Sequence, residues 1–66
     1  MTRLAALIEI RRLAEARGLQ PQDYRIRPFH DAEGDDLLRL DPHDGSEPIR
    51  VWYDSTEKPV QLSPAA

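Results

Sequence analysis

The sequence has no cysteine, and its 66 residues include only one Trp, one Phe and two Tyr. Without cysteine there is no disulfide framework and no thiolate metal site. No apolar run is long enough to cross a membrane, and charged residues interrupt the N-terminal segment, unlike the apolar core of a signal peptide. We therefore expect a cytoplasmic protein with a small core and a stability of roughly 3 to 5 kcal/mol.

The patterns that carry catalysis or metal binding are also missing. There is no Gly-rich phosphate loop and no Ser in a nucleophile-elbow context, and so short a chain has little room for a pocket that excludes water. Residues 31–36 alternate carboxylates as a calcium loop does, but Asp36 and Pro42 stand where that loop needs Gly and Glu. His30 and His43 fall in separate loops at opposite ends of the expected sheet. We expect no enzyme, no metal and no cofactor.

The longest regular pattern runs from Arg3 to Arg17 and predicts a helix. Thr2 precedes it as a candidate N-cap, Gly18 follows as a candidate left-handed C-cap, and no Pro or Gly lies between them. At 100° per residue its apolar side chains gather in a stripe about 120° wide, which is typical of a helix packed on a sheet. The stripe consists of Ala6, Leu7, Ile10, Leu13 and Ala14.

Three later stretches alternate or run apolar as strands do, at residues 24–29, 37–40 and 49–53. Pro21 forbids a continuation of the helix, and polar loops rich in turn residues separate the stretches at 30–36 and 41–47. Pro28 and Pro48 place the first and third strands at the edges and leave the second in the middle, because Pro cannot donate to a ladder. The short second stretch is also compatible with a helical turn.

These elements predict an α+β fold in which one N-terminal helix packs on a three-stranded antiparallel β-meander. We expect residues 1–54 to form this single domain. Residues 55–66 are expected to form a flexible C-terminal tail, except where Val60 and Leu62 contact the body.

The period of two sorts the strand residues onto two faces. The face expected under the helix holds Tyr24, Ile26, Leu38, Leu40, Ile49, Val51 and Tyr53. The opposite face is expected to hold Arg25, Arg27, Phe29, Leu37, Arg39, Arg50 and Trp52. Arg and Trp are the residues most enriched at binding hot spots, so this face is our candidate partner-binding surface. A simpler interpretation is a solvated face on which Arg stems shield the indole.

Two kinds of partner suit such a face. A nucleic-acid single strand would stack bases on Phe29 or Trp52 and place phosphates on the arginines. However, residues 30–66 carry nine acids against three bases, and the net charge of the chain is −3, so the loops around the face would repel phosphate. We therefore expect a protein partner, and the chain would act as an adaptor, inhibitor or regulatory subunit.

Leu4 and Ile8 lie one helical turn apart and outside the core stripe. We expect them to pack against a second copy of the chain, with Arg11, Arg12 and Glu15 at the rim of a homodimer interface. The alternative is a monomer in which Val60 and Leu62 of the tail cover the two side chains.

Overall fold

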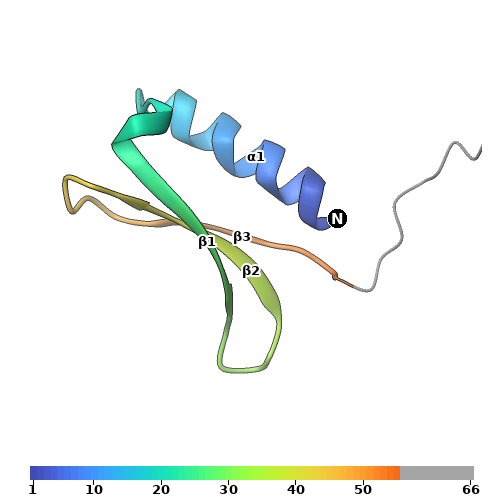
Figure 1. Cartoon of the computed structure of the whole chain (residues 1–66). Helices are drawn as coiled ribbons and strands as arrows, with labels where there is room; N and C mark the ends of the chain where they lie inside the picture. The colour runs from blue at the N-terminus through green and yellow to red at the C-terminus, as the bar shows by residue number, and fades with distance from the viewer. Residues whose placement is uncertain (56–66) are drawn as a thin grey trace, which may run out of the picture.

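The computed structural model describes residues 1–55. It contains a helix, α1 (Arg3–Ala16), a short 3-10 helix, η1 (Pro21–Asp23), and the strands β1 (Tyr24–His30), β2 (Asp36–Pro42) and β3 (Ile49–Trp52). The strands form one antiparallel sheet in the order β1-β2-β3, and α1 lies across one of its faces (Figure 1). The predicted α+β fold with a meander is confirmed. The expected contacts of Val60 and Leu62 fall outside the described residues.

Both predicted helix caps are present. The Thr2 hydroxyl accepts a hydrogen bond from the Ala5 amide at 3.1 Å. At the other end Gly18 has a φ of 80°, and its amide and that of Leu19 donate back to carbonyls of the last turn. This Schellman arrangement places Gly18, which has no Cβ, in the left-handed conformation just after the C-cap Arg17. It also directs Leu19 back against the core.

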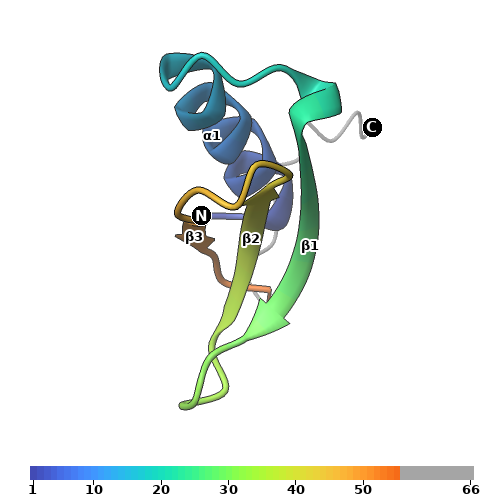
Figure 2. The ribbon, with the colours of Figure 1, turned by 90° about the vertical axis from the view of Figure 1, so that its left-hand side faces the viewer.

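The core lies between α1 and the central part of the sheet. Ala6, Ile10 and Ala14 of the predicted stripe are fully buried, and Leu7 and Leu13 are half-buried at its borders. On the sheet side the same cluster continues through Leu38, Leu40 and Val51. The helix packs chiefly on β3 and β2, so β1 lies at the less covered side, as Figure 2 shows.

β1 and β2 are longer than predicted, whereas β3 ends at Trp52, one residue before the predicted end at Tyr53. β1 includes His30, and β2 continues through Asp41 to Pro42, so these residues are not in loops as expected. Pro42 lies in the central strand, which we predicted to be free of Pro, and Pro48 precedes β3 rather than lying in it. The central strand tolerates Pro42 because the pairing of β2 with β3 stops at Leu40 and Ile49, so no strand lies on that side of Pro42 to accept a hydrogen bond from it.

Candidate functional site

The strand register arranges the sheet face that α1 does not cover in rows across the strands. We call this surface the open face; it consists of Arg25, Arg27, Phe29, Leu37, Arg39, Asp41, Arg50 and Trp52. All six predicted partner-binding residues lie on it, and Asp41 is the addition that the sequence analysis placed in a turn. The alternation missed Asp41 because the predicted strand ended at Leu40, two residues before the end of β2 at Pro42, although the period of two continues through Asp41.

One row of the open face is apolar. Phe29, Leu37 and Trp52 are cross-strand neighbours on β1, β2 and β3. Leu37 is only 4% exposed although no helix covers it, whereas the side chain of Trp52 remains about half exposed at 48%. Because Phe29 and Trp52 flank Leu37 in this row, we attribute its burial to these neighbouring side chains rather than to a second layer of structure.

The next row is cationic and consists of Arg27, Arg39 and Arg50. Asp41 neutralises part of it, with its carboxylate 3.0 Å from Arg39 Nε and 3.6 Å from Arg27 Nη2. The Arg39 guanidinium also lies 4.1 Å from the centroid of the Phe29 ring, a cation–π contact that joins this row to the apolar one. Among the described residues, neither Arg50 nor Arg25 has an ion-pair or hydrogen-bond partner for its side chain.

The loop between β1 and β2 holds the indole in place. Trp52 Nε1 donates to Asp31 Oδ2 at 3.0 Å, and Asp31 Oδ1 accepts from the backbone amides of Glu33 and Asp35, each at 2.9 Å. The pKa of the Asp31 carboxyl is lowered, chiefly by the Asp35 amide and then by the indole N–H, because these donors favour the ionised form. The sequence offered no signal for this contact, since it joins residues 21 positions apart.

Asp31, Glu33 and Asp35 bring carboxylate oxygens within 4.8 Å of one another in the same loop. Both oxygens of Asp31 already accept hydrogen bonds from within the protein. We therefore interpret Asp31 as the hydrogen-bond acceptor that closes the hairpin loop, and we do not interpret the cluster as a set of metal ligands.

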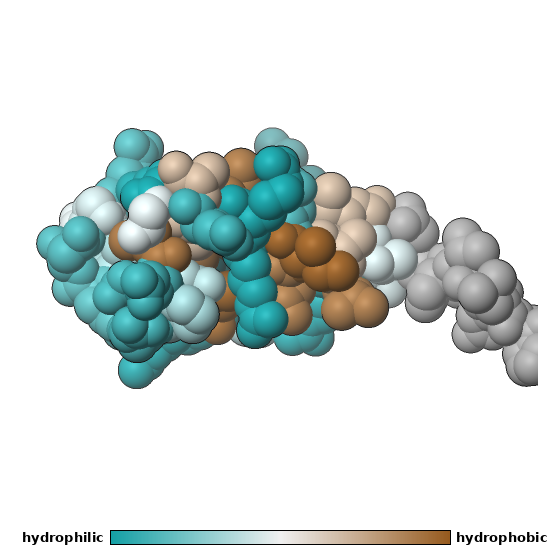
Figure 3. All heavy atoms as spheres, turned by 90° about the horizontal axis from the view of Figure 1, so that it is seen from above, coloured by the Kyte–Doolittle hydropathy of each residue, from teal (hydrophilic) through white to brown (hydrophobic). Residues whose placement is uncertain are grey.

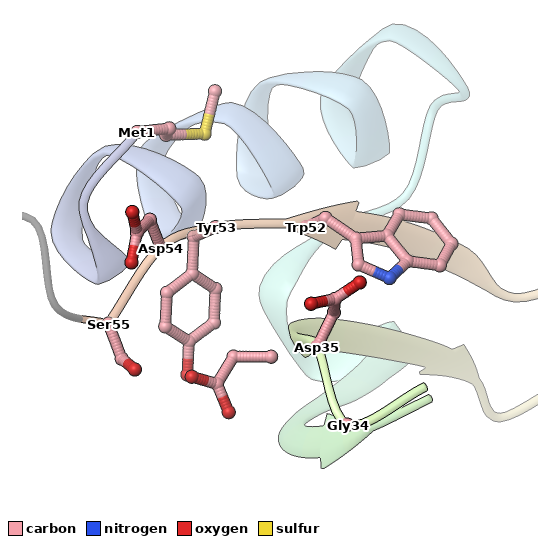
Figure 4. Close-up of a pocket in the computed structure, with 8 residues that line it drawn as sticks. Met1, Gly34, Asp35, Trp52, Tyr53, Asp54 and Ser55 are labelled. Carbon is pink, nitrogen blue, oxygen red and sulfur yellow. The ribbon is translucent and has the colours of Figure 1, made fainter. Parts of the chain in front are cut away.

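A solvent-open hollow lies beside the end of β3 (Figure 4). Trp52 and Tyr53 border it, and the carboxyl group of Asp35 points toward the indole. Asp36 also lines the hollow and binds His30 on the neighbouring strand, with 2.7 Å between Oδ1 and Nε2. The hollow is therefore acidic, and it adjoins the exposed edge of the indole.

A second apolar surface lies on α1. Leu4 is 66% exposed and Ile8 is 62% exposed, as the helical wheel predicted. Beside Leu4 the helix and β1 enclose an apolar hollow whose walls include Leu7, Ile26, Pro28 and Leu38. Viewed from above, hydrophobic side chains gather toward the N-terminal half of α1 (Figure 3). We call Leu4 and Ile8 the helix strip.

The residues predicted around the helix strip are all exposed. Arg12 is paired within its own chain to Glu9, with 2.7 Å between Nη2 and Oε2, whereas Arg11 and Glu15 have no side-chain ion pair among the described residues. The Arg12 guanidinium lowers the pKa of the Glu9 carboxyl, chiefly by hydrogen bonding.

Comparison with known protein families, with curated proteins and with solved structures gives no match for this chain. Within residues 1–55 no helix is long and apolar enough to span a membrane. The open face and the helix strip are therefore the features of this chain that bear on its function.

Proposed function

We propose that this protein is a small, non-catalytic interaction module that binds a protein partner through the open face of its sheet. The observation that carries the proposal is a half-exposed Trp52, anchored by Asp31, beside a row of three arginines. An aromatic ring held in one orientation loses little conformational entropy on binding, and arginine offers fixed donors to carboxylates. Such a module would act as an adaptor, an inhibitor or a regulatory subunit.

The charges of the open face favour a protein over a nucleic-acid strand. Asp41 lies among the arginines and already pairs with Arg27 and Arg39, so fewer cations remain for phosphates. The acidic loop that holds Trp52 would also repel a backbone placed along the indole. A folded or extended protein segment can avoid these acids and still use the ring.

The test uses a double variant, Arg27→Ser with Trp52→Ser. The native chain is used to capture partners from a lysate of its host, and the captured protein is then purified and titrated. We expect the double variant to lose at least about 30-fold in affinity, as substitutions at binding hot spots do. Trp52→Ser uncovers part of Leu37 and should lower the stability, but the fold should persist because both side chains lie outside the core beneath α1, and circular dichroism checks this.

The matched control is Arg3→Ser, which removes one positive charge from α1, away from the open face. It should bind as the native chain does. Equal affinity for the native chain and the folded double variant would overturn the proposal. Binding of a labelled single strand that weakens by orders of magnitude between about 50 and 200 mM salt would establish the nucleic-acid alternative instead.

We also propose that the helix strip joins two copies of the chain. Leu4 and Ile8 are the most exposed large hydrophobic residues among those described, and the apolar hollow lies beside them. A two-fold axis would place the strip of each copy against the strip and hollow of the other, with Arg11, Arg12 and Glu15 at the rim. Such an interface leaves both open faces free for partners.

Sedimentation at micromolar concentration tests the homodimer. We expect the native chain to sediment as a dimer, and Ile8→Glu to sediment as a folded monomer because it places a charge in the strip. The control Glu33→Gln removes one carboxylate from the exposed loop between β1 and β2, away from α1, and should stay dimeric. A monomeric native chain would overturn this proposal and leave the helix strip to another neighbour.

A further inference from the structure

The two outer edges of the sheet differ in what they offer to another strand. In an antiparallel pair, the N–H and C=O groups of alternate residues point to the same neighbour. The Asp23 carbonyl accepts from the His43 amide at 2.8 Å, so Tyr24, Ile26 and Pro28 direct their main-chain groups away from β2. Pro28 has no N–H, and it therefore interrupts the outer edge of β1 in the middle of the strand.

The outer edge of β3 has no such interruption. The Tyr53 amide donates to the Asp36 carbonyl at 3.1 Å, so Val51 faces β2 by the same alternation, and Arg50 and Trp52 face outward. Among residues 1–55, no hydrogen bond from another segment reaches the outward main-chain groups of Arg50 and Trp52.

Other parts of the chain bind main-chain groups just beyond each end of β3. The Met1 carbonyl accepts from the Asp54 amide at 2.8 Å, and Arg17 Nη1 donates to the Glu47 carbonyl at 2.9 Å. The free edge therefore has a defined length, bounded by Met1 and by Arg17.

We infer that this edge of β3 binds an extended, acidic segment of a partner as a fourth strand. The inference rests on the proposed function and specifies how the open face would be used. A strand added beside β3 makes main-chain hydrogen bonds to Arg50 and Trp52, and every second side chain of that strand joins the open face.

Charge selects an acidic segment for this position. Arg50 lies beside Arg39 on its inner side and has no side-chain partner among the described residues. A carboxylate on the added strand directly opposite Arg50 would supply the missing counter-ion. A second copy of β3 could not do so, because Ile49–Trp52 contains no acidic residue.

The test measures amide hydrogen exchange by NMR on the full chain, with a capped octapeptide of seven Thr and one central Glu (the Glu/Thr peptide) as the probe, so that one carboxylate can face Arg50 without another beside the acidic loop at Trp52. In the free protein the amides of Arg50 and Trp52 should exchange quickly, while that of Val51 is protected. Saturation with the Glu/Thr peptide should slow exchange at Arg50 and Trp52 at least tenfold. The matched Lys/Thr peptide should leave both amides unprotected.

Variants separate the contribution of the Arg50 main chain to peptide binding from that of its side chain. Arg50→Thr keeps the N–H but loses the charge, so affinity for the Glu/Thr peptide should fall about fivefold or more while protection at saturation persists. Arg3→Thr should bind the peptide as the native chain does.

The outcomes distinguish binding at the outer edge of β3 from binding on the open face. Peptide binding that shifts Trp52 fluorescence but leaves the amides of Arg50 and Trp52 unprotected would overturn strand addition while sparing the proposed function. Absence of binding at millimolar peptide, or equal protection by the Lys/Thr peptide, would overturn the acidic segment. Protection that grows with protein concentration alone would assign the edge to a second copy and likewise overturn the inference.

Discussion

The two faces of this sheet each bury a leucine of β2, but they do so by different means. Leu40 is fully buried under α1, whose backbone fixes the side chains that cover it. Leu37 is almost as well buried on the open face, where its cover consists of side chains from the two neighbouring strands. A covered face therefore supplies stability, whereas a face covered by its own side chains can rearrange when a partner arrives.

The largest effect is expected on the face that α1 covers. Leu40→Ala leaves a cavity between α1 and the sheet that the helix cannot close, so we expect a loss of about 2 to 5 kcal/mol. A domain of this size has roughly 3 to 5 kcal/mol in total, and much of the variant should be unfolded at 25 °C. Urea denaturation followed by circular dichroism measures the loss. A loss below 1 kcal/mol would show that α1 adds little to the core.

The same substitution on the open face should cost less. Leu37→Ala removes as many atoms, but Trp52 and Phe29 can move toward the space, so we expect a loss of about 1 to 2 kcal/mol. The same urea experiment measures it, and Trp52 emission reports the movement because this is the only tryptophan in the chain. A loss equal to that of Leu40→Ala would mean that the open face is a second rigid core, and therefore a poor candidate for adaptive binding.

Sequence periodicity was sufficient for the covered face. The period of the helix selected Ala6, Ile10 and Ala14, and the period of two selected Leu38, Leu40 and Val51, because burial under a second layer imposes a repeat on both partners. Helix caps were predictable for a similar reason, since Thr2 and Gly18 act on neighbours only a few residues away.

The sequence predicts which residues lie on the open face, but not which of their side chains contact one another. Alternation placed Leu37 on the open face and so predicted that it is exposed, whereas it is buried. The alternation could not predict this burial, because it contains no information on how well adjacent side chains cover one another. The continuation of β2 through Asp41 to Pro42 was missed because the Asp-Pro dipeptide also suits a turn, and only the pairing with β1 decides between the two. The bond from Trp52 to Asp31 depends on where a loop folds in space.

The hydrogen bond from Trp52 to Asp31 is the basis of the smallest expected effect, which is confined to the open face. Asp31→Asn retains an oxygen for the loop amides but offers an N–H₂ group where Trp52 Nε1 needs an acceptor. We expect the indole to be released at neutral pH, with a red shift of its emission and little change in the urea midpoint. The matched control is Asp35→Asn, which changes a carboxyl near the indole that is not its acceptor, and it should keep the native emission.

Acid should produce the same release in the native chain. The folded-state pKa of Asp31 lies below its ordinary value near 4, so the carboxylate stabilises the folded loop fully above that pH. This contribution is lost as the pH falls below about 4 and through the lowered folded pKa, when protonation removes the acceptor. Glu9 and Asp44 also have lowered pKa values, because of Arg12 and Ser46 respectively, but neither contacts the indole. Emission of Trp52 between about pH 5 and 2, with far-ultraviolet circular dichroism to exclude global unfolding, should therefore show a red shift in the native chain. The shift should be absent in Asp31→Asn, and an identical acid transition in that variant would show that another group holds the ring.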